Sequence, residues 1–170
     1  MKKLTQKQID LFLKENNAIE GVYDEVSFKQ ARRAWEYLMS KDILTPGVIL
    51  KTHKILMLHL KLFPNEKGYF RNCEVRIGNR FGLEAAKVRE EIEHWIMNMN
   101  DVVENGKKES DIFKEKIIKE HHIKYEEIHP FVDGNGRTGR LFLNWERLKV
   151  GMDLLIIKES ERSDYYKWFK

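Results

Sequence analysis

Helix-start signals recur along this chain, and an apolar stripe with helical spacing follows each one. In the first two signals, a Ser or Thr is followed three residues later by Gln, the capping-box pattern in which each side chain bonds the other residue's backbone N–H. In the third, a Thr stands before a Pro at the first helical position. These starts are Thr5–Gln8, Ser27–Gln30 and Thr45–Pro46. The repeated signal predicts a chain built mainly of α-helices.

Further segments carry apolar residues at the same helical spacing. The clearest stripes are Val88, Ile92, Trp95, Ile96 and Met99 in one segment and Phe113, Ile117, Tyr125 and Ile128 in the next. The predicted helices cover residues 5–16, 27–41, 45–63, 82–103, 110–128, 134–150 and 163–169. The expected fold class is therefore all-α, a mainly helical bundle.

One stretch departs from the helical pattern. Residues 68–80 contain a glycine near each end and alternate around Cys73, Val75 and Ile77. Such alternation between glycines predicts a short β-hairpin. The chain has no linker, repeat or low-complexity segment, so we expect residues 1–170 to form a single domain.

Composition places the chain among ordinary globular proteins. Hydrophobic residues make up 42% of the 170 residues and charged residues 34%. Cys73 is the only cysteine, which excludes an internal disulfide and favours a reducing, cytoplasmic setting. The first residues lack the apolar run of a signal peptide, and no stretch has the length and apolarity of a membrane span. We therefore expect no membrane partner.

The net charge of +4 raises the question of a nucleic-acid partner. Acidic and basic residues are mixed along the chain, and no predicted helix presents a basic stripe free of acids. A nucleic-acid partner is therefore disfavoured, and a bound anion would need a local site.

The stretch HPFVDGNGRTGR predicts such a site. Gly134, Asn135 and Gly136 stand where a loop becomes a helix, and glycines let backbone N–H groups converge on an anion at the positive end of the helix dipole. Arg137 and Arg140 follow at once and offer forked donors to phosphate oxygens. The pattern indicates a polyphosphate site.

Two side chains of the same stretch supply chemistry beside that site. Asp133 offers the hard carboxylate oxygen that Mg²⁺ takes together with substrate phosphates. His129 has an imidazole that titrates near neutral pH and can accept a proton from an attacking hydroxyl. The histidines on other predicted helices, His53, His59 and His121, lack the partners of a metal site and are interpreted as structural.

The whole string resembles the signature of the Fic (Fido) family, H-P-F-x-D-G-N-G-R-x-x-R, at all nine specified positions. The resemblance implies a small, mostly helical enzyme that transfers AMP from ATP to a Ser, Thr or Tyr hydroxyl of a target protein. In that role His129 is the catalytic base, and Asp133 holds Mg²⁺ between the α- and β-phosphates.

The same resemblance assigns the other motif residues to nucleotide binding: Gly134, Asn135, Gly136, Arg137 and Arg140. It places the Asn135 side chain near the α-phosphate and the two guanidinium groups on the β- and γ-phosphates. The predicted hairpin falls where the family has a flap that binds the target chain by strand pairing, here through Cys73, Val75 and Ile77.

A second resemblance lies near the N-terminus, within the segment 5–21. The family's inhibitory helix carries the pattern [S/T]-x-x-x-E-[G/N], and NNAIEG matches it at Glu20 and Gly21, with Asn16 in place of Ser or Thr. The resemblance implies that Glu20 pairs with Arg140 and fills the space of the γ-phosphate. Asn makes side-chain hydrogen bonds as Ser does, so we expect the inhibition to survive.

Other interpretations stay open at this point. Other members of the Fic family use UTP, GTP or a choline nucleotide, and the sequence does not show which nucleobase this chain prefers. A helical module that binds nucleic acid is a second alternative. The target protein and the oligomeric state are also open, and the tyrosines of DYYKWF make self-modification conceivable.

Overall fold

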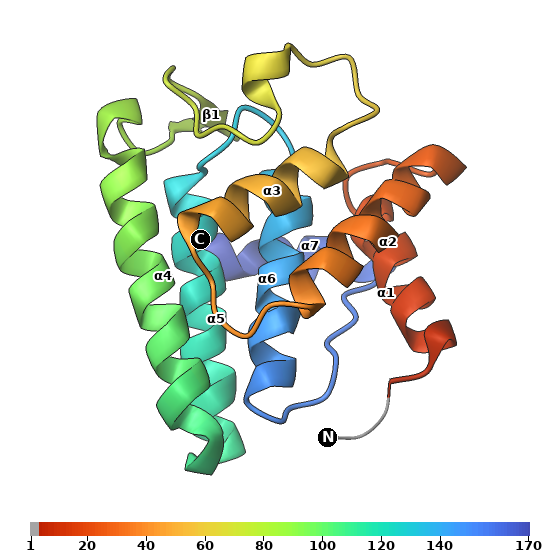
Figure 1. Ribbon diagram of the computed structural model, residues 1–170, viewed down its shortest axis with the longest axis vertical. Coiled ribbons are helices and arrows are strands. Elements are labelled where there is room, and N and C mark those ends of the chain that lie inside the picture. The colour runs from red at the N-terminus through yellow and green to blue at the C-terminus, as the bar shows by residue number, and fades with distance from the viewer. Residues whose placement is uncertain (1–3) are drawn as a thin grey trace.

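The computed structural model describes residues 4–170 and is a helical bundle with one small hairpin (Figure 1). Its α-helices are α1 Gln6–Ala18, α2 Glu25–Met39, α3 Pro46–Leu56, α4 Val88–Asn105, α5 Asp111–Ile128, α6 Asn135–Lys149 and α7 Arg162–Tyr166. Short 3₁₀ turns cover residues 64–66, 85–87, 106–108, 159–161 and 167–169. The strands are β1 Arg76–Ile77 and β2 Arg80–Phe81. The predicted all-α class is confirmed.

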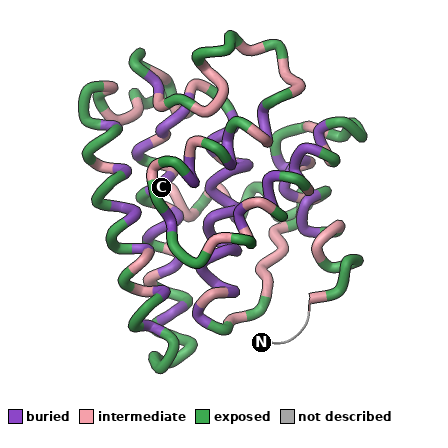
Figure 2. The backbone as a smooth tube through the Cα atoms, viewed as in Figure 1, coloured by how far each residue is buried: buried purple, intermediate pink, exposed green. Residues whose placement is uncertain are grey.

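Helix α6 forms the centre of the bundle, with thirteen of its fifteen residues buried (Figure 2). Helices α1 to α5 all pack against it. The core beside it is aromatic: Phe142 of α6 contacts Trp95 of α4 and Tyr125 of α5 edge to face, and Trp145 belongs to the same cluster. None of these side chains is more than 2% exposed. Burying each contributes roughly 1.5–3 kcal/mol, so the core fixes α6 and the loop that leads into it.

Local capping signals set two of the three predicted helix starts. Thr5 and Gln8 form the reciprocal capping box, and the Thr45 side chain caps α3. The predicted cap at Ser27 was wrong, because α2 begins after Asp24, whose carboxylate accepts a hydrogen bond from the Ser27 N–H at 2.8 Å. A carboxylate at the positive end of the helix dipole is a strong cap.

Helix α3 is shorter than its apolar pattern predicts, since it ends at Leu56 instead of Phe63. The chain turns at Met57, whose sulfur lies 3.3 Å from Arg137 Nη2. Pro64 further disfavours a helical conformation in the residue before it. The prediction of a helix to 63 was wrong because the apolar residues after the turn lie in a loop.

The predicted hairpin exists, but it is shorter and lies further along the chain. Strand β1 pairs antiparallel with β2, and the turn between them begins at Gly78, with φ of 60°. Cys73 and Val75 lie outside the strands, and Cys73 is exposed in the bend before β1. The alternation around Cys73 therefore extended the predicted strand too far toward the N-terminus.

The start of α4 and the buried face of α5 also differ from the prediction. Helix α4 begins at Val88 and not at residue 82, because Gly82 donates its N–H to the Val75 carbonyl at 2.9 Å and a 3₁₀ turn covers residues 85–87. In α5, Tyr125 and Ile128 are buried as predicted, but Phe113 remains 47% exposed and Ile118 is buried in place of Ile117, so the first half of the predicted stripe was wrong. No helix in the described part of the chain combines the length and apolarity that crossing a membrane requires.

Candidate functional site

The imidazole of His129 lies at the C-terminal end of α5, where the backbone adopts a left-handed conformation with φ of 49°. Its Nδ1 lies 3.3 Å from the carbonyl oxygen of Glu126. A carbonyl only accepts, so the proton is assigned to Nδ1 and Nε2 is left as an acceptor. Burial holds the pKa of His129 below its usual value. The ring is therefore neutral near pH 7 and able to take up a proton.

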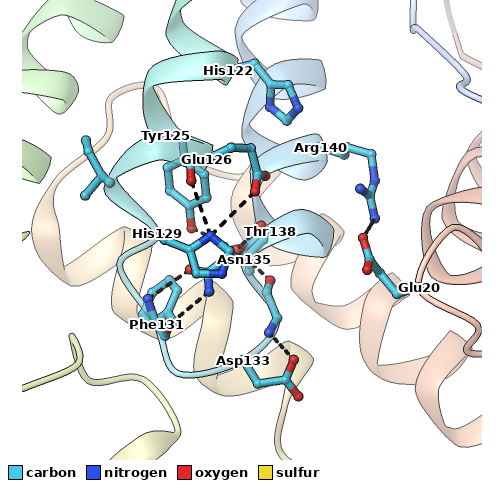
Figure 3. Close-up of polar contacts among 12 residues, drawn as sticks. Glu20, His122, Tyr125, Glu126, His129, Phe131, Asp133, Asn135, Thr138 and Arg140 are labelled. Carbon is cyan, nitrogen blue, oxygen red and sulfur yellow. Dashed lines mark hydrogen bonds and ion pairs between the residues drawn. The ribbon is translucent and has the colours of Figure 1, made fainter. Parts of the chain in front are cut away.

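The loop after His129 is closed by the Asn135 side chain (Figure 3). Its Oδ1 accepts the Phe131 N–H at 2.9 Å, and its Nδ2 donates to the Phe131 carbonyl at 2.8 Å. Asn135 is 2% exposed. Its side-chain amide thus fixes the conformation of the loop. Its backbone N–H belongs to the first helical turn, where N–H groups have no intrahelical partner.

A histidine from α3 supports the same loop from the other side. The ring of His53 stacks on Phe131 with centroids 3.7 Å apart, and its Nε2 lies 2.9 Å from the carbonyl oxygen of Asp133. Its Nδ1 accepts the Gly68 N–H at 3.0 Å, which assigns the ring proton to Nε2. Burial lowers the pKa of His53 to about 4. The structural interpretation of His53 is confirmed, and its contact is with the motif itself.

The glycines of the motif are required for space. Gly134 has φ of 79°, and a Cβ there would lie 2.7 Å from the sulfur of Met57. At Gly136 a Cβ would collide with Oε1 of Glu20. A carboxylate oxygen thus rests directly on the bare backbone at the start of α6, where an anion is favoured.

Asp133 fits the role of a metal-binding carboxylate. Its Oδ1 accepts the Gly134 N–H at 2.6 Å, its Oδ2 lies 3.9 Å from Arg137 Nη2, and its side chain is 55% exposed. Among the described residues no group of three or more metal-binding side chains forms a cage. One exposed carboxylate next to a phosphate site is the kind of site in which Mg²⁺ keeps waters and substrate oxygens as its other ligands.

Arg137 is buried in the first turn of α6 and has hydrogen-bond donors without a partner. Its residue is 3% exposed, and Nε and Nη1 have no hydrogen-bond partner in the described part of the chain. A guanidinium stays charged even where burial lowers its pKa, as it does here. Buried polar groups are nearly always paired, so this geometry fits a site that accepts an anion.

Arg140 is bound by the N-terminal segment and by α7, and Figure 3 shows its contact with Glu20. Its Nη2 donates to Oε1 of Glu20 at 2.8 Å and to the backbone carbonyl of Asn16 at 2.9 Å. Its Nε donates to Oδ1 of Asn16 at 2.6 Å, and its Nη1 donates to the hydroxyl of Tyr165 at 3.3 Å. Glu20 lies in the turn after α1, where Gly21 reverses the chain with φ of 69°.

Asn16, which stands where the family pattern has Ser or Thr, makes two side-chain hydrogen bonds to α6. Besides accepting from Arg140, it donates from Nδ2 to the carbonyl of Arg137 at 3.1 Å. The two ends of one amide therefore hold both motif arginines, and only this orientation of the amide satisfies both bonds. The segment around Glu20 is fixed on α6 by these contacts.

Two cavities meet at Glu20. The first, which we call the loop cavity, has about 400 Å³ and is lined among others by His129, Asp133 and Arg137. The second, the hairpin cavity, has about 390 Å³ and lies between the β1–β2 hairpin and α7. Its walls include Ile77, Arg80, Glu126, Tyr166 and Phe169. Glu20, His129 and Gly136 line both cavities.

The structure thus brings the predicted motif residues and Glu20 to one place, and of the predicted flap side chains only Ile77 lines a cavity there. The sequence did not single out Glu126 or Arg71, which also lie at the site. Glu126 faces the hairpin cavity, and burial raises its pKa to about 7. Its position three residues before His129 on a helix was the signal that places it beside the imidazole.

Comparison with known proteins agrees with this geometry. A family model described as Fic/DOC family matches residues 43–146. The chain is 32% identical over 136 residues to the protein adenylyltransferase Fic of Drosophila mojavensis, covering 78% of this chain and 25% of that protein. The corresponding protein of Drosophila grimshawi is 31% identical, with 26% of it covered. The chain spans about a quarter of the length of these curated relatives.

Solved structures share the fold. A Fic domain-containing signaling protein from Bacteroides thetaiotaomicron superposes with a TM-score of 0.78 at 16% identity, covering 95% of this chain and 70% of that one. Fic-1 from C. elegans gives a TM-score of 0.78 at 22% identity, covering 96% and 55% of the respective chains. At such identities the likeness concerns the fold alone.

Proposed function

Because this chain belongs to the Fic/DOC family, we propose that it transfers AMP from ATP to a hydroxyl group of a target protein. The carrying observation is the convergence of a neutral imidazole, a helix N-terminus and the unpaired donors of buried Arg137 on one cavity. The names of the curated relatives, protein adenylyltransferases, support AMP as the transferred group.

In the proposed reaction His129 Nε2 takes the proton of the target hydroxyl while the hydroxyl oxygen attacks the α-phosphorus. A bond forms between that oxygen and phosphorus, the bond from the α-phosphorus to the bridging oxygen breaks, and pyrophosphate leaves with its electron pair. The first-turn N–H groups of α6 hold the phosphates, and Arg137 balances their negative charge. Arg140 does the same once Glu20 has left it.

Asp133 would hold Mg²⁺ at this site, with its exposed carboxylate oxygen as the protein ligand. The ion neutralises phosphate charge and orients the polyphosphate when it is bound. Two contacts hold Asp133 in position for this role. The Gly134 N–H donates to its carboxylate, and Nε2 of His53 donates to its backbone carbonyl.

The hairpin cavity is the proposed site of the nucleobase. Ile77, Tyr166 and Phe169 give it apolar and aromatic walls, and about 390 Å³ suits part of a nucleotide. Tyr165, by contrast, is 3% exposed and bonded to His122, so only Tyr166 of the two adjacent tyrosines remains accessible for self-modification.

We also propose that the segment around Glu20 keeps the enzyme inactive. Its carboxylate rests against Gly136 and pairs with Arg140, which is the place a terminal phosphate would take. A carboxylate and a phosphate compete for the same guanidinium donors. ATP can therefore bind productively only when Glu20 moves away.

Label transfer tests both proposals. The wild-type chain, Glu20→Gly and Glu20→Gly/His129→Ala are incubated with Mg²⁺, α-labelled ATP and a cell lysate. We expect weak labelling of protein by wild type, at least tenfold more by Glu20→Gly, and none above background by the double variant. Label that persists without His129 would remove the proposed base, and equal labelling by wild type and Glu20→Gly would remove the inhibition. Parallel reactions with α-labelled GTP and UTP determine the donor.

A further inference from the structure

Arg71 joins the β1–β2 hairpin to the end of α5, a contact that the reaction described above does not use. The residue is 4% exposed. Its Nε donates to the carbonyl of His129 at 2.7 Å, and its Nη2 donates to the carbonyl of Ile128 at 3.2 Å. Its backbone N–H also donates to the carbonyl of Pro130 at 2.9 Å. One residue thus holds three successive carbonyls around the proposed base.

The same guanidinium holds both arms of the hairpin. Its Nη1 donates to the carbonyl of Cys73, ahead of β1, at 2.8 Å. Its Nη2 donates to the carbonyl of Leu83, beyond β2, at 2.5 Å. The hairpin itself has only two residues in each strand, and so short a pair is not stable without outside support.

The electrostatics favour this arrangement without an acidic partner. No carboxylate in the described part of the chain lies within ion-pair distance of Arg71, and its partners are the carbonyls named above. The last carbonyls of a helix have no intrahelical partner and lie at the negative end of its dipole. A buried cation is therefore stabilised there by α5 itself.

We propose that Arg71 is a positioning residue that fixes the hairpin and the backbone of His129 relative to each other. The catalytic consequence rests on the proposed function: a target segment bound by the hairpin would then be positioned next to the imidazole of His129. Lysine cannot replace it, since one ammonium group cannot span four carbonyls in the plane of a guanidinium fork.

Limited proteolysis tests the structural half, whether or not the chain is a transferase. Arg76 and Arg80 are exposed trypsin sites within the hairpin. In Arg71→Lys we expect cleavage after them to be at least tenfold faster than in wild type, as followed by mass spectrometry of the fragments. The matched control is Arg147→Lys, another buried arginine, which bonds the Asp153 carbonyl and Glu115 at the far end of α6. Hairpin cleavage in that variant should stay within twofold of wild type, and equal acceleration in both variants would overturn the proposal.

The catalytic half is measured in the Glu20→Gly background. We expect Arg71→Lys to slow labelling of lysate protein at least tenfold. The loss of Mg-ATP affinity, measured by calorimetry, should be smaller than this, because the hairpin forms only part of the wall of the proposed nucleobase site. Arg147→Lys in the same background should change neither quantity more than twofold. A loss of labelling no larger than the loss of ATP affinity would overturn the positioning role. If the Glu20→Gly parent itself labels nothing, the proposed function fails, and the proteolysis result still decides whether Arg71 holds the hairpin.

Discussion

At the scale of single residues, the site depends on side chains that hold other side chains. Arg140 and Glu20 form the ion pair, and Asn16 holds α1 against α6 beside it, because its amide bonds Arg140 and the backbone of Arg137. Its neighbour Asn17 is equally buried, yet its Oδ1 has no hydrogen-bond partner among the described residues. Two adjacent asparagines thus differ in their connection to the site.

Replacing Asn16 by alanine should release the segment around Glu20, which we propose to be inhibitory. Hydrogen bonds to charged groups contribute about 1.5–3 kcal/mol each, so we expect Asn16→Ala to tighten Mg-ATP binding about tenfold in calorimetry. Asn17→Ala is the control and should leave the Kd within twofold of wild type. The role assigned to Asn16 is wrong if the two variants bind ATP equally. Asn16→Ser, which restores the family's pattern, should fall between wild type and alanine.

Glu126 carries a pH dependence that belongs to the same scale. Burial is the main reason that its pKa rises to about 7, with Arg140 opposing and Glu20 adding to the rise, and its side chain is 12% exposed. A carboxyl with a raised pKa contributes its full stability below about pH 4.5 and loses it as the pH rises through about 7. Glutamine mimics the protonated form at every pH.

We therefore expect Glu126→Gln to unfold at nearly the same temperature as wild type at pH 5 and at a higher temperature at pH 8. The difference in free energy of unfolding at pH 8 is at most about 3 kcal/mol. Thermal unfolding followed by circular dichroism at both pH values measures it. Glu127→Gln, on the exposed face of α5, is the control and should show no such trend. A constant difference between pH 5 and 8 would contradict the raised pKa.

At the scale of elements, the sequence predicts what is decided locally and fails where distant contacts decide. The starts of α1 and α3 follow from capping residues within one turn. The end of α3 does not, because Met57 turns there to meet Arg137, eighty positions later in the chain. The hairpin is also misjudged, since Arg71 and not strand alternation holds its arms.

The candidate site divides in the same way. The motif residues share one loop and one helix start, so their convergence was predictable from spacing alone. Glu20 was placed by a resemblance, and Asn16 and Arg140 lie 124 positions apart. Arg71 and His53 could not be assigned, because nothing in a sequence says which backbone carbonyls a buried donor will meet.

At the scale of the whole molecule, the fold places its first helix across the start of its central one. Two further contacts anchor helix α1. Asp10 forms an ion pair with Arg32 of α2 at 2.6 Å, and Glu15 accepts the N–H of Glu159 at 2.7 Å. Tyr23 adds a bond to the Glu159 carboxylate at 2.5 Å. The contact between Glu20 and Arg140 is thus part of the packing of the bundle, and if it is inhibitory as proposed, removing it should change how nucleotide stabilises the entire chain.

A ligand that binds only the folded state raises its stability by mass action, by about 2.7 kcal/mol at one hundred times its Kd. For a chain of this size that corresponds to a rise in Tm of roughly 5 to 10 °C. We expect Mg-ATP at a fixed millimolar concentration to produce such a rise in Glu20→Gly and less than a third of it in wild type, each compared with its own Tm without nucleotide. Glu20→Gln, which keeps the bulk and loses the charge, should lie between them. Equal rises in all three would mean that the carboxylate does not compete with nucleotide, because a competing group must lower the apparent affinity wherever it occupies the site.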